Sequence, residues 1–130
     1  IVLAQAAIES GWGSSRFAQE YNALFGEYTY DNTKGVIPLE RENGETHLIK
    51  AFNSYNNSVE SYFNNINSHY AYEDFRDIRN IMRTRNNFSN VNLLVDRLST
   101  YAEDENYIKT IKQVIKSNNF IVFDQKTISY

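Results

Sequence analysis

One glutamate is better placed than any other residue of this sequence to do acid–base chemistry. Glu9 lies among apolar and small residues, about one helical turn before the Gly11-Trp-Gly13 break. A carboxyl group in apolar surroundings at the C-terminal end of a helix resists ionisation, so we expect its pKa to be raised. A carboxylic acid that stays protonated near neutral pH can donate its proton to a leaving group. The segment therefore predicts a buried helix that delivers a general acid to a cleft.

A second carboxylate is expected from a stretch rich in strand-forming residues. Glu40, Glu42 and Glu45 surround the Asn43-Gly44 pair, and strand alternation would put Glu40 and Glu42 on one face. Each of the three, taken singly, is also explained as a solvated charge of a hairpin. Glycoside hydrolysis requires a carboxylate across a groove from the acid. One of the three is therefore expected to supply the second carboxylate, and the residues alone leave open which one does.

Two tyrosines, Tyr101 and Tyr107, bracket an acidic connection between two predicted helices. One phenol could reach into the cleft and bind substrate or stabilise charge; alternatively, both rings pack between the helices. The two histidines, His47 and His69, lack the spacing of metal ligands, and the chain has no cysteine. We therefore expect no metal and no cofactor.

Composition narrows the class of protein. The 130 residues suit a single domain over residues 1–130, and 42% hydrophobic with 22% charged residues is typical of a globular chain. The net charge of −3, without a basic cluster, argues against nucleic acid as a partner. No apolar run is long enough to span a membrane. Because the chain starts with Ile1 inside an apolar helix, we expect it to be a fragment that lacks an upstream segment.

The hydrophobic pattern predicts an α+β fold that is mainly α. A helix apolar on every side is expected over residues 1–10, and a short one from Ser14 or Ser15 to Tyr21. A turn over residues 22–26 and an antiparallel β-hairpin lobe over 27–52 follow, with Asn43-Gly44 as the hairpin turn. Pro38 indicates that one of the strands is at an edge or begins there. A cleft is expected between this lobe and the helices. Four later helices are predicted from the spacing of Val59, Tyr62, Phe63 and Ile66; of Phe75, Ile78, Ile81 and Met82; of Val91, Leu94, Val95 and Leu98; and of Tyr107, Ile108, Ile111 and Ile115. Residues 120–130 are expected to be extended or loosely packed.

Several of these segments resemble a known family. The run from Ala4 to Gly13, with Ser15–Ala18 and Asn22–Gly26, resembles the glucosaminidase domain of glycoside hydrolase family 73. Further segments are similar to the bacterial Bax-like branch of this family. They are residues 35–38, 46–47, 58–62, 64–69, 71–72, 75–79 and 98–101. The resemblance extends over nearly the whole chain, to about Phe120.

The resemblance implies a lysozyme-like fold and hydrolysis of β-1,4 bonds after N-acetylglucosamine in peptidoglycan. Glu9 matches the catalytic acid, and Tyr101 matches a recurrent active-site tyrosine. Glu40 falls where some members have a second acid, so the resemblance implies Glu40 as the second catalytic residue, with Glu42 as the alternative. The expected location is the cell envelope, periplasmic or extracellular, and we expect a monomer. The remaining candidates, assigned to substrate binding, are Trp12, Asn22, Phe25, Gly26 and Tyr107.

The sequence departs from the family at two places. Ala23 stands where relatives often have Asn, and Thr29 and Lys34 stand where a cysteine pair is expected in Bax-like relatives. Neither change affects Glu9. Two other functions remain open: a lysozyme-like module that binds glycan without cutting it, and an amidase acting on the stem peptide, although amidase chemistry usually needs zinc or a Cys/His pair.

Overall fold

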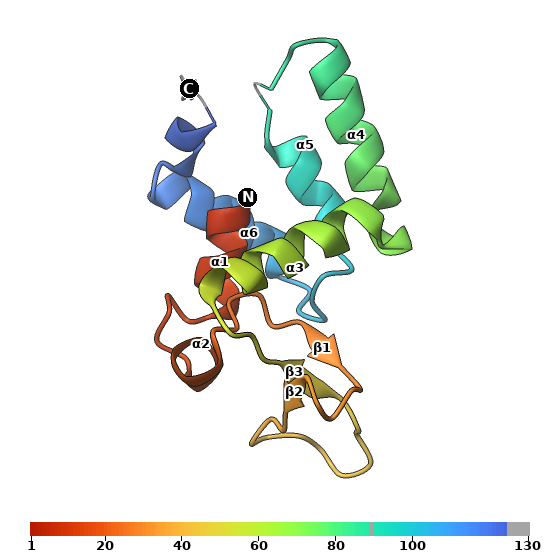
Figure 1. Ribbon diagram of the computed structural model, residues 1–130. Coiled ribbons are helices and arrows are strands. Elements are labelled where there is room, and N and C mark those ends of the chain that lie inside the picture. The colour runs from red at the N-terminus through yellow and green to blue at the C-terminus, as the bar shows by residue number, and fades with distance from the viewer. Residues whose placement is uncertain (89, 125–130) are drawn as a thin grey trace. The chain divides into compact units, whose positions relative to one another are not determined.

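The computed structural model describes residues 1–88 and 90–124, and its elements are labelled in Figure 1. These residues form two compact units. One is Gln5–Asn65, and the other combines Ile1–Ala4 with the chain from Ile66 onward. The mainly helical content with one small antiparallel sheet confirms the predicted α+β class.

The unit Gln5–Asn65 begins within α1 (Val2–Glu9), at Gln5, and continues with α2 (Arg16–Tyr21). The predicted glycine break ends α1, because Gly11, Trp12 and Gly13 all have positive φ, at 56°, 58° and 78°. This is a conformation that glycine adopts at little cost and tryptophan does not. Ser15 then caps α2, as predicted, by accepting a hydrogen bond from the backbone N–H of Ala18 at 3.1 Å.

One prediction for α1 is wrong in part. The helix was expected to be buried on every side, but Leu3 is 46% exposed while Ala4, Gln5 and Ala7 are buried. Apolar residues therefore occupy a larger part of the surface of α1 than the part that packs in the core. Among the described residues, no helix is both long and apolar enough to cross a membrane.

The β-lobe is a three-stranded antiparallel sheet of β1 (Tyr28–Thr29), β2 (Gly35–Val36) and β3 (Leu48–Lys50), with β3 in the centre. Ile49 is paired with Tyr28 on one side and with Val36 on the other. Figure 1 shows the two short edge strands beside β3. The prediction for Pro38 is wrong, because this residue lies two positions after the end of edge strand β2 and on no strand of the sheet. Proline has no backbone N–H to donate to a sheet.

The two-residue hairpin predicted at Asn43-Gly44 is wrong. These residues do form a turn, with Gly44 at a φ of 91°, but the connection between β2 and β3 extends from Ile37 to His47. Glu40 and Glu42 lie within this connection and not on a strand. Strand alternation therefore does not put them on a common face.

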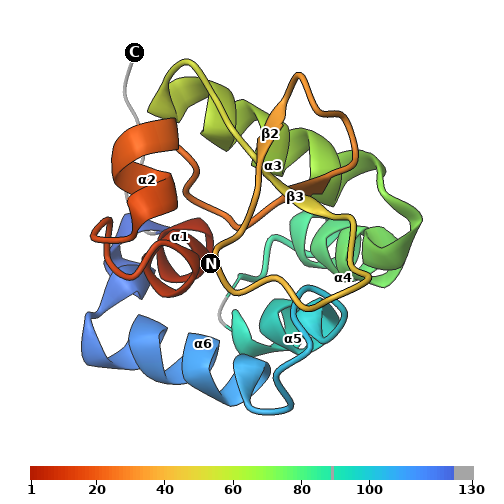
Figure 2. The same ribbon diagram turned by 90° about the horizontal axis from the view of Figure 1, so that it is seen from below.

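The helices after the sheet follow the predicted pattern. They are α3 (Tyr55–Ser68), η1 (Tyr70–Tyr72), α4 (Glu73–Thr84), α5 (Asn92–Val95), η2 (Asp96–Leu98) and α6 (Tyr107–Ser117). In the unit from Ile66 onward, α5 contacts both α4 and α6 (Figure 2). Most predicted inner positions are buried, but Phe63 and Ile81 are each 44% exposed. The buried side chains of this unit include Phe75, Met82, Val95, Leu98, Tyr107, Ile111 and Ile115.

The last described segment differs from the prediction. Asn119 has a φ of 51° and ends α6, after which Phe120–Phe123 form a short 3-10 helix, η3, and not an extended segment. The rest of the predicted tail, residues 125–130, lies outside the described residues.

Candidate active site around Glu9

The carboxylate of Glu9 lies at the end of α1, directly against the backbone of Gly26. A Cβ atom placed on Gly26 would lie 2.8 Å from Oε2 of Glu9, which is closer than real Cβ contacts come. Gly26 also has a φ of 64°. Both features require glycine at position 26. Because glycine has no side chain, the half-buried side chain of Glu9 packs directly against the backbone there.

Glu9 lines a cavity of about 230 Å³, which we call the Glu9 pocket. Its other walls come from α2, the 22–26 loop, β1 and β3. Aliphatic and aromatic side chains dominate the lining, and Tyr28, although 63% exposed, contributes an aromatic ring. The pocket is lined by Glu9, Phe17, Ala23, Gly26, Tyr28 and Ile49.

Hydrogen bonds around the glycine break fix the end of α1. The buried Ser10 hydroxyl donates to the carbonyl of Ala6 at 2.6 Å and accepts from the backbone N–H of Gly13 at 2.9 Å. The backbone N–H of Trp12 donates to the carbonyl of Ala7 at 2.8 Å. The chain therefore turns sharply after Glu9, and the side chain of Trp12 is left 63% exposed.

The 22–26 loop is fastened at three points within its unit. Asn22 Nδ2 donates to the carbonyl of Phe52 at 3.0 Å, and the N–H of Leu24 donates to the buried Ser58 hydroxyl at 3.1 Å. Phe25 is buried and its ring stacks on Tyr62 with centroids 4.3 Å apart. These contacts hold Gly26 in place beneath Glu9. Asn22 and Phe25, both proposed for substrate binding, are thus also part of the support of the site.

A deeper layer of the support joins α1 to α3. The Tyr62 hydroxyl donates to Oε1 of Gln5, and both side chains are fully buried. Gln5 lies one turn before Glu9 on α1. The bond therefore connects the helix of Glu9 to Tyr62, the residue on whose ring Phe25 stacks.

Glu27 is a half-buried carboxylate that sequence reasoning missed. Its Oε2 accepts a hydrogen bond from Ser61 at 2.6 Å and lies 3.9 Å from Nζ of Lys50, which itself donates to Ser61 at 2.9 Å. Burial raises the pKa of Glu27, while the Ser61 hydrogen bond and the Lys50 charge lower it in part. The other oxygen, Oε1, is buried without a hydrogen-bond partner among the described residues.

Glu27 does not line the Glu9 pocket. Its neighbours Gly26 and Tyr28 do, whereas its own side chain reaches Ser61 of α3. This alternation is that of extended chain, in which successive side chains point to opposite sides. The group therefore supports the pocket from behind. A Glu next to Gly26 was the only sequence signal for it, and this signal does not by itself indicate burial.

The other catalytic candidates are placed as follows. Glu40 is exposed, in a turn between β2 and β3, and is not part of the lining of the Glu9 pocket. Tyr101 and Tyr107 belong to the unit from Ile66 onward, where their rings stack with centroids 5.9 Å apart. Tyr107 is 3% exposed, and Tyr101 is half-buried. The roles assigned to these residues stay predictions.

Titratable groups near the sheet are arranged in pairs and not as a metal cage. His47 Nδ1 lies 3.8 Å from Oε2 of Glu45, and the His47 ring stacks on Tyr28 with centroids 4.3 Å apart. Within residues 1–88 and 90–124, no group of three or more His, Asp or Glu side chains is arranged to hold a metal ion.

The fold and the pocket define the class of this protein. It is a mainly helical α+β protein in which a glutamate ends an apolar helix and a small sheet lies beside that glutamate. The chain belongs to the glucosaminidase family. The model of that family, described as mannosyl-glycoprotein endo-beta-N-acetylglucosaminidase, matches residues 1–120. This confirms the resemblance on which the sequence-based expectations rested.

Relatives support the same assignment. The chain is 31% identical over 102 residues to Protein bax of Escherichia coli (strain K12), covering 78% of this chain and 35% of that protein. It is 41% identical over 71 residues to peptidoglycan hydrolase FlgJ of E. coli, in both strain K12 and O157:H7, covering 47% of this chain and 22% of FlgJ. The chain thus spans about a third or less of these relatives. No solved structure matches it.

Proposed function

We propose that this chain is a glycoside hydrolase that cleaves β-1,4 bonds after N-acetylglucosamine in bacterial cell-wall peptidoglycan. The observation that carries the proposal is the contact between Glu9 and Gly26, which holds one carboxyl group in a partly apolar pocket. Membership of the glucosaminidase family and the similarity to a peptidoglycan hydrolase support the substrate class. The expected place of action is the cell envelope, periplasmic or extracellular.

In the proposed reaction, Glu9 protonates the glycosidic oxygen as the oxocarbenium-like transition state develops. The aliphatic lining and the C-terminal end of α1 both favour the neutral acid that this step requires. The proton moves from the carboxyl group to the leaving oxygen, and a water molecule then completes the hydrolysis.

Two routes for the water step follow from the remaining candidates. Glu40 could activate the water at long range, which would invert the anomeric centre. Alternatively, the 2-acetamido group of the substrate assists, with Tyr101 supporting the charge, and the configuration is retained. NMR of the product anomer immediately after cleavage distinguishes the two routes.

The test is Glu9→Gln assayed on purified peptidoglycan, with products identified by mass spectrometry. Loss of a general acid should lower the rate by about 10²–10⁴-fold. The matched control is Glu60→Gln, an exposed substitution on α3 that should leave the rate unchanged. An N-acetylglucosamine reducing end among the wild-type products supports the proposal. Released stem peptides would indicate an amidase, binding without products a glycan-binding module, and a fully active Glu9→Gln variant would exclude Glu9 as the acid.

A further inference from the structure

The β-lobe contains a second cavity, separate from the Glu9 pocket. It has a volume of about 450 Å³, within the range of about 300–1,000 Å³ that is usual for small-ligand sites. No residue lines both cavities. We call this one the Arg41 pocket. It is lined by Asn32, Gly35, Ile37, Arg41, Thr46 and Leu48.

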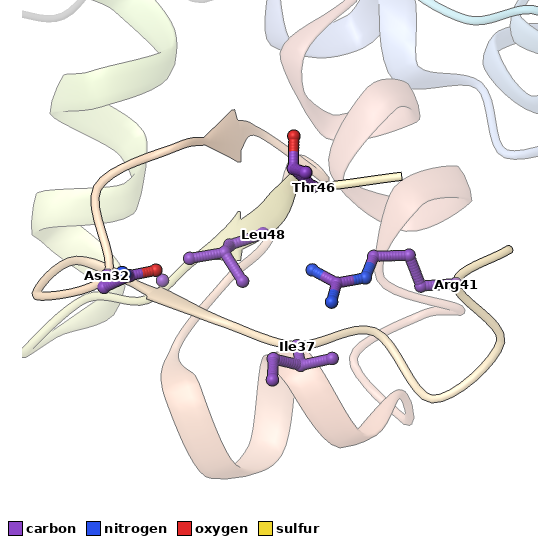
Figure 3. A pocket seen from close by; sticks show the side chains of 6 residues that line it. Asn32, Ile37, Arg41, Thr46 and Leu48 are labelled. Atoms are coloured by element: carbon purple, nitrogen blue, oxygen red, sulfur yellow. The ribbon is translucent and has the colours of Figure 1, made fainter. Parts of the chain in front are cut away.

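The chemistry of the Arg41 pocket is that of an apolar floor with polar groups at its two ends. In Figure 3 the guanidinium of Arg41 and the amide of Asn32 point toward each other from opposite sides, across the side chains of Ile37 and Leu48. Ile37 is 59% exposed although it lies in the lining, so it presents apolar surface that a ligand could cover.

Arg41 is held in place and keeps donors available. Its Nη1 donates to the carbonyl of His47 at 3.2 Å, which fixes the side chain with one of its five N–H groups. Within the described part of the chain, Arg41 takes part in no ion pair. A guanidinium anchored through a backbone carbonyl and facing a cavity is suited to bind a carboxylate.

The nearby acids do not occupy this guanidinium. Glu40 and Glu42 are exposed and do not line the pocket. Glu45 accepts a hydrogen bond from the N–H of Glu42 at 3.2 Å and lies beside His47. The positive charge of Arg41 therefore faces the cavity with an amide opposite it.

The floor has a fixed shape because β2 approaches β3 closely. A Cβ atom on Gly35 would lie 2.6 Å from both Cβ of Leu48 and Cγ2 of Thr29. Glycine is thus required at position 35, where β2 pairs with β3. Of the two residues of the floor, Leu48 lies on the central strand β3 and Ile37 directly follows the edge strand β2 that pairs with it.

We propose that the Arg41 pocket binds a short peptide with a free carboxylate and small apolar side chains. The carboxylate pairs with Arg41, the side chains cover Ile37 and Leu48, and Asn32 hydrogen-bonds the peptide backbone. The biological reading rests on the proposed function: peptidoglycan carries short acidic peptides on its glycan, and this pocket would hold one of them while the glycan occupies the Glu9 pocket.

The binding test does not require catalysis. The ¹⁵N-labelled chain is titrated with N-acetyl-alanyl-alanine and, separately, with its C-terminal amide. We expect chemical-shift changes in the segments 32–37 and 41–48 with the acid and at least about tenfold weaker binding of the amide, because a charge-assisted pair is lost. Equal binding of acid and amide, or changes confined to other segments, would overturn the proposal.

Substitutions locate the interaction. Arg41→Gln should weaken binding of the acid about tenfold or more, Arg41→Lys should retain part of it, and Arg85→Gln, an exposed control in the other unit, should retain all of it. An Arg41→Gln variant that binds like the wild type would contradict the assignment. Circular dichroism and the melting temperature confirm that the variant folds.

An activity assay separates this inference from the proposed function. Arg41→Gln should raise KM several-fold on peptide-bearing glycan and leave KM unchanged on glycan stripped of its peptides. Equal changes on both substrates would overturn the role of Arg41 in holding the peptide. If the wild type hydrolyses neither substrate, the proposed function fails, and the titration still decides whether the peptide binds.

Discussion

Oε2 of Glu9 lies only 2.8 Å from the position that a Cβ atom on Gly26 would take. The two residues are far apart in the sequence and meet because the 22–26 loop is fastened to α3 and to Phe52. One side of the Glu9 carboxylate packs against the backbone of Gly26, and another side faces the Glu9 pocket. In the proposed reaction, this geometry determines where Glu9 delivers its proton.

Gly26→Ala should therefore impair the site more than the fold. The new methyl group must displace the Glu9 carboxylate, and a misplacement of about 1 Å can cost about 10²-fold in rate. Alanine at a positive φ should also cost about 1–2 kcal/mol of stability. Peptidoglycan turnover and thermal melts measure the two effects.

Gly44→Ala is the matched control for this substitution. Gly44 has a φ of 91°, but a Cβ there would have no atom within 4 Å. It should lose a similar amount of stability and keep its activity. Equal losses of activity in the two variants would mean that backbone strain, and not contact with Glu9, causes the effect.

The parts of the fold that could be predicted are those specified by nearby residues. The end of α1 at Gly11 and the cap of α2 at Ser15 depend on residues within a turn of each other. The long β2–β3 connection could not be predicted, because Asn43-Gly44 indicates a turn but not the length of chain around it. Because Glu40 lies in this connection and not on a strand, strand alternation does not determine which face its side chain occupies.

The candidate site shows the same division. The position of Glu9 at the end of an apolar helix could be predicted because its apolar neighbours lie on the same short helix, and its role as the acid stays a prediction. The burial of Glu27 could not, because it results from a contact with Ser61, 34 residues away. Likewise, Tyr28 lies in the segment 27–52 that was predicted to form the β-lobe, and only the tertiary structure brings its ring to the Glu9 pocket.

Tyr62→Phe should destabilise the support of the site. The variant keeps the ring that stacks on Phe25 but removes the hydroxyl that donates to the fully buried Gln5. Loss of one partner of a buried amide should cost about 1–3 kcal/mol. Urea unfolding measures it, and Tyr55→Phe, at an exposed tyrosine of α3, is the control. A Tyr62→Phe variant as stable as the control would mean that the bond contributes nothing.

Asn22 allows its structural and binding roles to be separated. It ends α2 at a φ of 55° and donates to Phe52. Asn22→Ala loses both the preferred conformation and the bond, and should cost about 1–2 kcal/mol; Asn22→Gly keeps the conformation and should cost less. If Asn22 also binds substrate, both variants should raise KM equally, whatever their stability. A KM that follows stability would contradict the binding role.

The raised pKa of Glu27 makes a prediction about pH. Its cause is burial, which disfavours the charged form more than Ser61 and Lys50 favour it. The folded state therefore binds the proton more tightly than the unfolded state. Above the raised pKa the wild type carries the full penalty of a buried charge, and below the ordinary value of 4.5 both states are protonated and the penalty vanishes.

Glu27→Gln should consequently be more stable than the wild type at pH 7, because it removes the charge and keeps an oxygen that can accept from Ser61. This advantage should shrink as the pH falls through the raised pKa and disappear below the ordinary one. Unfolding free energies measured by urea denaturation from pH 7 to pH 4 test it, with Glu60→Gln on the exposed side of α3 as the control. If Glu27→Gln were less stable at pH 7 and approached the wild type only in acid, the ion pair with Lys50 would outweigh desolvation, and Glu27 would stabilise the back of the Glu9 pocket through its charge.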